Sequence, residues 1–349
     1  MSPIDLNYSP DPDWNRLRKA LKRDGEPDRV PLYELTISFD IMEQVLGRSR
    51  PEKPEKEMPS EWARFRTDFY YKTGYDFVGV GTPTGFQGKR PVSDSSNTLR
   101  GIIHDRKSFE AYPWPEITEE ALRCVHEAAA VLPEGMKVRP RGMGGILATT
   151  VRLMGFEGLS FALVDDPELV RMVTTEIGQR SEKLFDLYAQ VEDVDFITLG
   201  DDMGFKTSTM FSPDMLREFI LPWHKKIVQT IHVKGKVAIL HSDGNLEKIM
   251  DDVIACGWDA RHSIEDQIIT APESKKRWGN RIAICGAFDM DRLARSTPDE
   301  VREHTQHLIR TCAPGGSWAF GTGNAVSSFV AVENYAAMLE AAREFGRYE

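Results

Sequence analysis

The chain has 349 residues, of which 41% are hydrophobic, and its formal net charge is −10 at pH 7. An acidic chain without a basic stripe argues against nucleic acid as a partner, because phosphate backbones are bound by clusters of Lys and Arg. No apolar stretch has the length of a membrane span, and the polar residues 1–14 lack the pattern of a signal peptide. The four cysteines form no Cys-x-x-Cys pair, so we expect a cytoplasmic protein rather than a disulfide scaffold.

Short apolar runs alternate with helical patterns along the chain. Eight of these runs predict buried strands, namely 30–35, 77–81, 138–141, 196–200, 237–241, 259–262, 282–286 and 318–321. Parallel strands need a crossover between them, and eight strand–helix units can close into a ring. The pattern therefore predicts the α/β class and a single (β/α)8 TIM-barrel domain over residues 1–349. The polar run 259–262 leaves a doubly wound open sheet as the alternative.

Three helix starts stand out between the strands. Asp166, Ser212 and Thr297 each precede a proline, and a capping side chain before a proline is typical of the first helical turn. The third start also has the spacing of a capping box. Two segments, 47–60 and 82–98, are longer than barrel connections need and follow the first two strands. Each is therefore either a lid over the site or a solvated insertion.

Polar and ionisable side chains follow most of the predicted strands. The set comprises Glu34, Arg141, Asp201, Asp202, His241, Asp243, His262, Glu265, Asp266, Asp289 and Asn324. In a barrel the carboxyl ends of the strands meet at one mouth, so we expect these side chains to converge there. Their convergence, rather than any one residue, predicts an active site.

Each of these residues also has a structural interpretation. Asp201 and Asp202 are adjacent carboxylates that repel unless a cation or a proton relieves them, but they could equally cap the next segment or pair with Lys206. His241 could be a hydrogen-bonded core histidine, although polar residues follow it directly. We assign Asp201 and Asp202 to catalysis on the functional interpretation.

His241 and Asp243 stand two residues apart at the end of an apolar strand. If the strand continues through Asp243, both side chains project to the same side and can bind one divalent metal ion. We predict Glu265 as the third ligand, with Asp202 as the alternative. His262 either orients these ligands or acts as a general acid, while Glu265 could instead begin a helix.

The segment Gly-Thr-Gly-Asn at 321–324 follows the last predicted strand. Glycines there let a ligand approach the backbone, but the spacing is not that of a dinucleotide fingerprint because residue 326 is Val. The chain has no Gly-x-Ser-x-Gly elbow, phosphate-binding loop or His-Glu-x-x-His pair, which excludes the common hydrolase motifs. We expect Thr322 and Asn324 to bind substrate together with Glu34 and Asn245.

Five segments resemble the uroporphyrinogen decarboxylase superfamily, whose members share a (β/α)8 barrel. They are Gly-Asp-Asp-Met-Gly at 200–204, Pro-Trp-His-Lys-Lys at 222–226, His-Ser-Asp-Gly-Asn at 241–245, His-Ser-Ile-Glu-Asp at 262–266, and 321–324 with Glu-Asn-Tyr at 333–335. The true decarboxylases carry an N-terminal Arg-Gln-Ala-Gly-Arg segment that grips porphyrinogen carboxylates. The matching region here, 32–36, has no arginine, so a tetrapyrrole substrate is not expected.

The other branch of this superfamily comprises cobalamin-dependent methyltransferases, which often hold zinc with a His-x-Cys motif and a later cysteine. His241 matches the motif histidine, but Asp243 stands where the first cysteine is expected and Thr322 lies close to the place of the second. Oxygen ligands are harder than thiolates and suit an ether or amine better than a thiol. The resemblance thus implies a demethylase for a methoxylated or methylated-amine compound.

We therefore predict a metal-assisted methyltransferase with a bound divalent metal, zinc being the first choice. The chain has no Asp-x-His-x-x-Gly segment for a corrinoid, so the corrinoid is expected on a separate partner protein. The sequence leaves open whether the protein forms a homo-oligomer. The alternatives are a decarboxylase, in which Arg141 holds a carboxylate and Asp201 or Asp202 stabilises a protonated intermediate, and a catalytically silent ligand-binding barrel.

Overall fold

The computed structural model describes residues 8–52, 60–86 and 101–348. The strands are β1 (Phe77–Val80), β2 (Lys137–Pro140), β3 (Phe196–Gly200), β4 (Val237–His241), β5 (Ala260–His262), β6 (Ala283–Cys285) and β7 (Trp318–Ala319). The α-helices are α1 (Trp14–Lys22), α2 (Phe39–Leu46), α3 (Ser60–Thr73), α4 (Arg106–Ala111), α5 (Arg123–Ala129), α6 (Ile146–Met154), α7 (Phe156–Asp165), α8 (Pro167–Gln190), α9 (Pro213–Met215), α10 (Leu221–Val233), α11 (Met250–Ala255), α12 (Ala271–Trp278), α13 (Met290–Arg295), α14 (Pro298–Cys312) and α15 (Val332–Phe345). Short turns of other helix types are η1 (Glu119–Leu122), η2 (Leu216–Ile220) and η3 (Glu247–Ile249). Most of the two predicted long loops, 53–59 and 87–98, lies outside the described residues.

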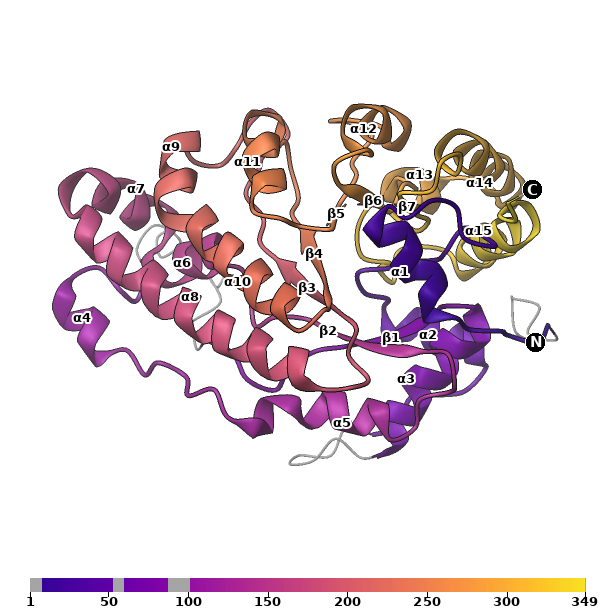
Figure 1. The fold of residues 1–349 in the computed structure, drawn as a ribbon, viewed down its shortest axis with the longest axis horizontal. Coiled ribbons are helices and arrows are strands. Elements are labelled where there is room, and N and C mark those ends of the chain that lie inside the picture. The colour runs from indigo at the N-terminus through magenta and orange to yellow at the C-terminus, as the bar shows by residue number, and fades with distance from the viewer. Residues whose placement is uncertain (1–7, 53–59, 87–100, 349) are drawn as a thin grey trace.

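The strands run parallel, and each pairs with the next strand along the sequence. One sheet joins β1 to β2, and the other runs in the order β3-β4-β5-β6-β7. Parallel bridges from Val138 to Val194 and from Arg141 to Thr198 connect the two sheets. Figure 1 shows the strands inside the molecule with helices around them. The carboxyl ends of the strands therefore gather at one end of the fold, where parallel α/β enzymes keep their sites.

The first predicted strand, 30–35, is reduced to a single bridge. Leu32 forms a parallel bridge with Phe320, just beyond β7, and the Tyr33 amide donates to the Phe320 carbonyl at 2.7 Å. This contact continues the sheet from β7 to an eighth parallel segment. The prediction of a full strand here is wrong, although the segment occupies the place of the eighth strand.

A buried arginine accounts for the missing ladder between this segment and β1. The Nη2 atom of Arg139 donates to the carbonyls of Glu34 and Leu35, which a ladder would otherwise offer to amides of a neighbouring strand. Side chains rather than backbone hydrogen bonds connect this segment to β1. The aromatic rings of Tyr33 and Phe77 lie 5.9 Å apart.

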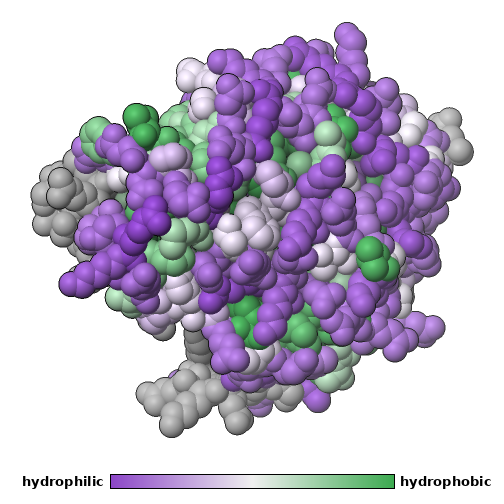
Figure 2. Space-filling model, turned by 60° about the vertical axis from the view of Figure 1, so that its left-hand side comes forward, coloured by the Kyte–Doolittle hydropathy of each residue, from purple (hydrophilic) through white to green (hydrophobic). Residues whose placement is uncertain are grey.

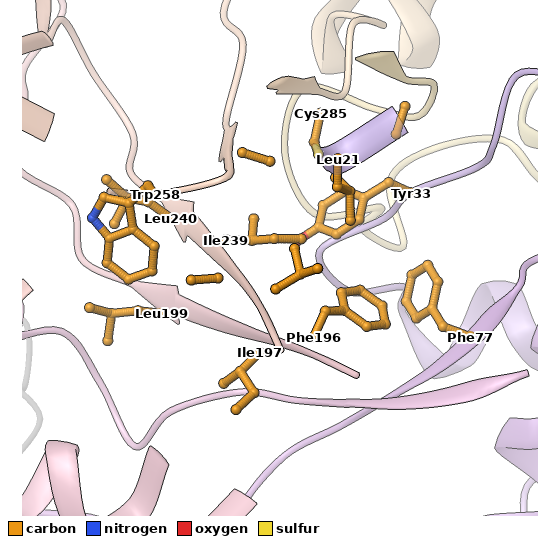
Figure 3. Close-up of a cluster of buried hydrophobic side chains, with 14 of the residues drawn as sticks. Leu21, Tyr33, Phe77, Phe196, Ile197, Leu199, Ile239, Leu240, Trp258 and Cys285 are labelled. Carbon is orange, nitrogen blue, oxygen red and sulfur yellow. The ribbon is translucent and has the colours of Figure 1, made fainter. Parts of the chain in front are cut away.

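The core of the ring is filled by aromatic and branched side chains from facing strands. Figure 3 shows Tyr33, Phe77, Phe196 and Ile239 gathered between the strands. The rings of Phe77 and Phe196 lie 5.2 Å apart in an edge-to-face arrangement, and all four residues are buried. These side chains pack closely between the strands, while parallel barrels keep their sites at the carboxyl ends of the strands.

The predicted helix starts are confirmed. The side chains of Asp166, Ser212 and Thr297 accept hydrogen bonds from amides in the first turns of α8, α9 and α14, each of which begins with proline. Thr297 and Glu300 also form the predicted capping box. The four cysteines are free thiols, as their spacing predicts.

The surface is mainly polar. The face in Figure 2 is largely hydrophilic, with hydrophobic groups in small separate patches. No single helix among the described residues is long and apolar enough to cross a membrane. Helices α6 and α7 together meet that test of length and composition, but they are bent by 95° where they join.

Candidate active site

Two histidines meet at the carboxyl ends of β4 and β5. His241 and His262 are register partners in the parallel ladder, so both side chains project to the same face at the same height. Their Nδ1 atoms lie 2.8 Å apart, within hydrogen-bond distance. His262 is fully buried and His241 nearly so. The sequence predicts both residues at the mouth but not their contact.

The hydrogen bonds fix where the protons of this pair reside. The Nε2 atom of His262 lies 3.1 Å from the carbonyl of Thr322, which only accepts, so Nε2 carries a proton. Burial lowers the pKa of His262 well below its usual range and that of His241 to about 4, so both rings are neutral near pH 7. The Nδ1 atom of His262 then accepts a proton from Nδ1 of His241. The Nε2 atom of His241 is left with a free lone pair.

That lone pair faces two carboxylates. Oxygens of Asp202 and Asp243 each lie 3.7 Å from Nε2 of His241, too far for a hydrogen bond. One ligand atom from each of the three residues lies within 4.8 Å of the others. The Asp202 and Asp243 side chains are 46% and 35% exposed, so solvent reaches the cluster. The arrangement presents one nitrogen and two oxygen donors to a shared point.

Backbone contacts hold the two carboxylates in place. The Asp243 amide donates to Asp202 at 3.0 Å, and the side-chain amide of Asn324 donates to both oxygens of Asp243. Gly244 has a φ of +85°, and a Cβ there would come within 2.2 Å of the carbonyl group of Gly204. Only glycine allows this close approach, which brings the loops after β3 and β4 together.

The cluster fits a divalent metal ion. Imidazole nitrogen and carboxylate oxygen are ordinary zinc ligands, and His241 offers the neutral nitrogen that metal binding requires. Burial and the neighbouring Asp243 and Asp201 carboxylates raise the pKa of Asp202, and a cation would relieve this repulsion. The predicted ligands His241 and Asp243 are thus brought together with Asp202.

Glu265, the third predicted ligand, lies beside the cluster rather than in it. One of its oxygens accepts a hydrogen bond from the Gly244 amide at 2.8 Å. Asn245, predicted to bind substrate, accepts from the Glu247 amide through its side-chain oxygen. Both side chains stabilise the loop after β4, and Asp202 takes the third position of the donor set.

Asp201 is separated from its neighbour Asp202. It is fully buried and accepts hydrogen bonds from the amides of Ile146, Leu147 and Ala148 at the start of α6. The Nε2 atom of His224 lies 2.8 Å from the same carboxylate. Asp201 therefore anchors a helix, where a negative charge is favoured, and its oxygens do not face the cluster.

Glu34 and Thr322 form a second buried pair next to the histidines. Glu34 is fully buried, and its oxygens contact the amide and the hydroxyl of Thr322. Burial raises the pKa of Glu34 to about 8. Thr322 is itself fully buried and also contacts the carbonyl of Asn324, so the predicted substrate-binding residues Glu34, Thr322 and Asn324 form one network.

Arg141 lies at the end of β2 with its side chain partly exposed. Burial, followed by the charge of Arg139, lowers the pKa of Arg141 to about 10. Arg139 itself is 1% exposed and was not singled out from the sequence. Two arginines spaced by two within a predicted strand were the available signal, because alternate residues of a strand share a face.

Asp289 and His224 are two further polar residues whose positions can be compared with the sequence predictions. Asp289, expected at the mouth, caps α13 by accepting from the Arg292 amide at 3.0 Å. His224, which sequence reasoning did not select, is fully buried against Asp201. Its place within the quoted segment 222–226 was the only signal for it.

Comparison with known proteins identifies both the family and the fold. Residues 91–345 match the family model described as uroporphyrinogen decarboxylase (URO-D). A methylated-thiol–coenzyme M methyltransferase of Methanosarcina mazei is 27% identical over 139 residues, which are 40% of this chain and 35% of that protein. The chain thus spans about a third of the length of this curated relative.

A solved structure extends the similarity over nearly the whole fold. A methyltransferase from Methanosarcina mazei superposes with a TM-score of 0.71 at 18% identity, covering 95% of this chain and 98% of that chain. This likeness confirms the predicted α/β barrel class.

Proposed function

The chain belongs to the uroporphyrinogen decarboxylase family, and from that premise we propose that it is a metal-assisted methyltransferase. It moves a methyl group from a small methoxylated or methylated-amine substrate to the corrinoid of a separate protein. The observation that carries this proposal is the convergence of His241, Asp202 and Asp243 on one point at the barrel mouth. The two similar proteins named above are both methyltransferases by their descriptions.

His241, Asp243 and Asp202 would hold the divalent metal, with zinc as the first choice. Such an ion supplies Lewis acidity, which makes the methyl-bearing oxygen or nitrogen a better leaving group. His262 serves as the positioning residue, because its hydrogen bond keeps the proton of His241 on Nδ1 and the lone pair on Nε2. Asn324 orients Asp243 in the same way.

The donor set supports an oxygen or nitrogen substrate. The relative from Methanosarcina mazei is described as acting on methylated thiols. This chain has carboxylates at Asp202 and Asp243, which are hard ligands and suit ether or amine chemistry. During transfer the bond from the methyl carbon to the heteroatom breaks, and the heteroatom keeps the electron pair. A proton from solvent can neutralise the product, since the cluster is open to water.

A decarboxylase is the second candidate, and one observation favours it. Arg141, a half-buried residue just beyond the end of β2, could hold a carboxylate. Asp201, however, already accepts three amide hydrogen bonds and contacts His224, which leaves it no role as a stabiliser of a protonated intermediate. Asp202 alone remains for that role.

A methyl-transfer assay tests the proposal. Zinc-loaded protein is incubated with cob(I)alamin and a panel of methoxylated and methylated-amine compounds, and the demethylated product is measured by mass spectrometry. We expect product with at least one compound from the wild-type chain and about a hundredfold less from His241→Ala, since metal chemistry supplies several kcal/mol. His104→Ala, at an exposed histidine away from the cluster, is the matched control. Release of carbon dioxide from the panel without demethylation would favour the decarboxylase instead.

A further inference from the structure

Arg141 is a cation without a counter-charge at the barrel mouth. Within the described residues its guanidinium makes no ion pair and no hydrogen bond, and the residue as a whole is half-buried. The groups whose charges act on it most strongly are two arginines and two tyrosines, not carboxylates. An arginine of this kind has all five of its donors available.

Arg139 lies two residues before Arg141 and adds a second positive charge on the same face of β2. Its Nη2 atom donates to two backbone carbonyls, while Nε and Nη1 are buried and have no hydrogen-bond partner among the residues that the structure describes. The guanidinium carbon lies 5.7 Å from the ring centre of Tyr33 and 5.4 Å from that of Phe77. Aromatic faces lessen the cost of burying this charge but do not neutralise it.

The charge of Arg139 acts on the Glu34 carboxyl, but the two side chains form no ion pair. The Glu34 side-chain oxygens contact Thr322, and Arg139 meets only the Glu34 backbone. Burial also keeps the Glu34 carboxyl protonated near pH 7. Two arginines thus share a partly desolvated site with no anion among the described side chains, an arrangement that a negatively charged ligand would stabilise.

The sheet register places this charge relative to the proposed metal cluster. Arg141 pairs with Thr198 on β3, whereas His241 pairs with Gly200 on the other side of the same strand. The Arg141 backbone therefore lies two residues, or about 7 Å, before the level of His241 when measured along the strand direction. It also lies two strand spacings, or about 10 Å, away across the sheet.

From this placement we infer that the site binds a short substrate with a carboxylate at one end and the methyl-bearing heteroatom at the other. Arg141 binds the carboxylate, since a guanidinium and a carboxylate match in a planar, two-point hydrogen bond. Arg139, two residues earlier on β2, adds a second positive charge near the bound carboxylate. The acid end lies at the end of β2, and the methyl end lies at the cluster, where the Asp202 and Asp243 carboxylates are exposed to solvent. The inference deepens the proposed function and rests on it only for the position of the methyl group.

Matched acid and amide probes test this subsite. The pairs are methoxyacetate with methoxyacetamide and 4-methoxybenzoate with 4-methoxybenzamide, titrated calorimetrically into zinc-loaded protein. We expect the wild-type chain to bind at least one acid about ten- to hundredfold more tightly than its amide, the range that a charge-assisted hydrogen bond provides. Arg141→Met should remove this preference and Arg141→Lys should retain part of it. Arg64→Met, at an exposed arginine of α3, should leave it unchanged.

The outcomes separate the subsite from the metal chemistry. Equal binding of every acid and its amide by the wild-type chain, or an undiminished preference in Arg141→Met, would overturn the anion subsite. Zinc content and thermal unfolding of the same variants show whether the fold and the cluster are intact. A wild-type protein that prefers the acid but binds no zinc would retain the subsite and refute the metal-assisted reaction.

Discussion

A single hydroxyl proton shows how the buried network near the mouth is ordered. The Thr322 hydroxyl contacts both Glu34 and the carbonyl of Asn324, but it has only one proton to donate. The carbonyl can only accept, so the Thr322 proton goes to Asn324 and the Glu34 carboxyl donates its own proton to Thr322. Geometry and burial thus agree that Glu34 is protonated in the folded protein.

Because Glu34 is protonated in the folded chain, the free energy of unfolding should decrease as the pH rises. Its pKa is 4.5 in an ordinary setting and about 8 in the folded chain, so between these values the folded state holds the extra proton. The free energy of unfolding should then decrease by about 1.4 kcal/mol per pH unit from this group. Glu34→Gln, which keeps both contacts without a titrating proton, should lack this component when denaturant unfolding is compared with wild type at pH 5 to 8. The same pH slope in both proteins would show that Glu34 is ionised when folded.

At the scale of elements, the end of β3 separates two adjacent carboxylates. Successive side chains of an extended chain point to opposite sides, and here Asp201 turns to the start of α6 while Asp202 turns to the loop after β4. A Cβ at Gly145 would come within 2.2 Å of the Asp201 carboxyl, so the glycine before α6 is what admits the carboxylate. The end of β3 thus carries one residue that anchors a helix and one proposed metal ligand.

Asp201→Asn should therefore damage stability rather than metal binding. The asparagine would turn an amide group toward donors of α6 and weaken the buried contact with His224, in which both side chains are fully buried. We expect a loss of about 3–5 kcal/mol in the free energy of unfolding, measured by urea titration. Zinc stoichiometry of the folded fraction should stay at the wild-type value. Unchanged stability with lost zinc would instead make Asp201 part of the cluster.

The sequence pattern was enough to predict features, such as helix starts, that depend on residues close together in the chain. The proline-led helix starts at Asp166, Ser212 and Thr297 are local signals, and the structure has them where predicted. The position of His241 and His262 at the ends of their strands also agrees with the sequence, whereas the contact between their rings was not predicted. The sequence did not predict that segment 30–35 lacks a full strand. This depends on hydrogen bonds that Arg139, which is distant in sequence, donates to the carbonyls of the segment.

In the candidate site, too, local features could be predicted from the sequence, whereas contacts between distant residues could not. Spacing suggested that His241 and Asp243 share a side if the strand continues through Asp243; β4 ends at His241, and the two side chains lie in one cluster. The choice between Glu265 and Asp202 as third member was not available from spacing, because it depends on the contact of the Gly204 and Gly244 loops. The proton positions were out of reach as well, since they follow from hydrogen bonds between residues far apart in sequence.

For the whole molecule, the ring of parallel strands collects donors from β3, β4 and β5 at one end. Helices surround the strands (Figure 1), and buried apolar side chains gather between the strands (Figure 3). The mouth then holds two regions of opposite character, the Asp202–Asp243 carboxylates and the Arg139–Arg141 cations. A barrel with this polarity is suited to a small substrate that has two different ends.

The central claim is that His241, Asp243 and Asp202 bind a divalent metal. The most direct test is elemental mass spectrometry on the chain after zinc loading and removal of free ions. We predict near-stoichiometric zinc in the wild-type protein, almost none in His241→Ala, and an affinity reduced about ten- to hundredfold in His262→Ala because that residue only orients the ligand. Folded wild-type protein without bound metal, or equal zinc in His241→Ala, would contradict the account.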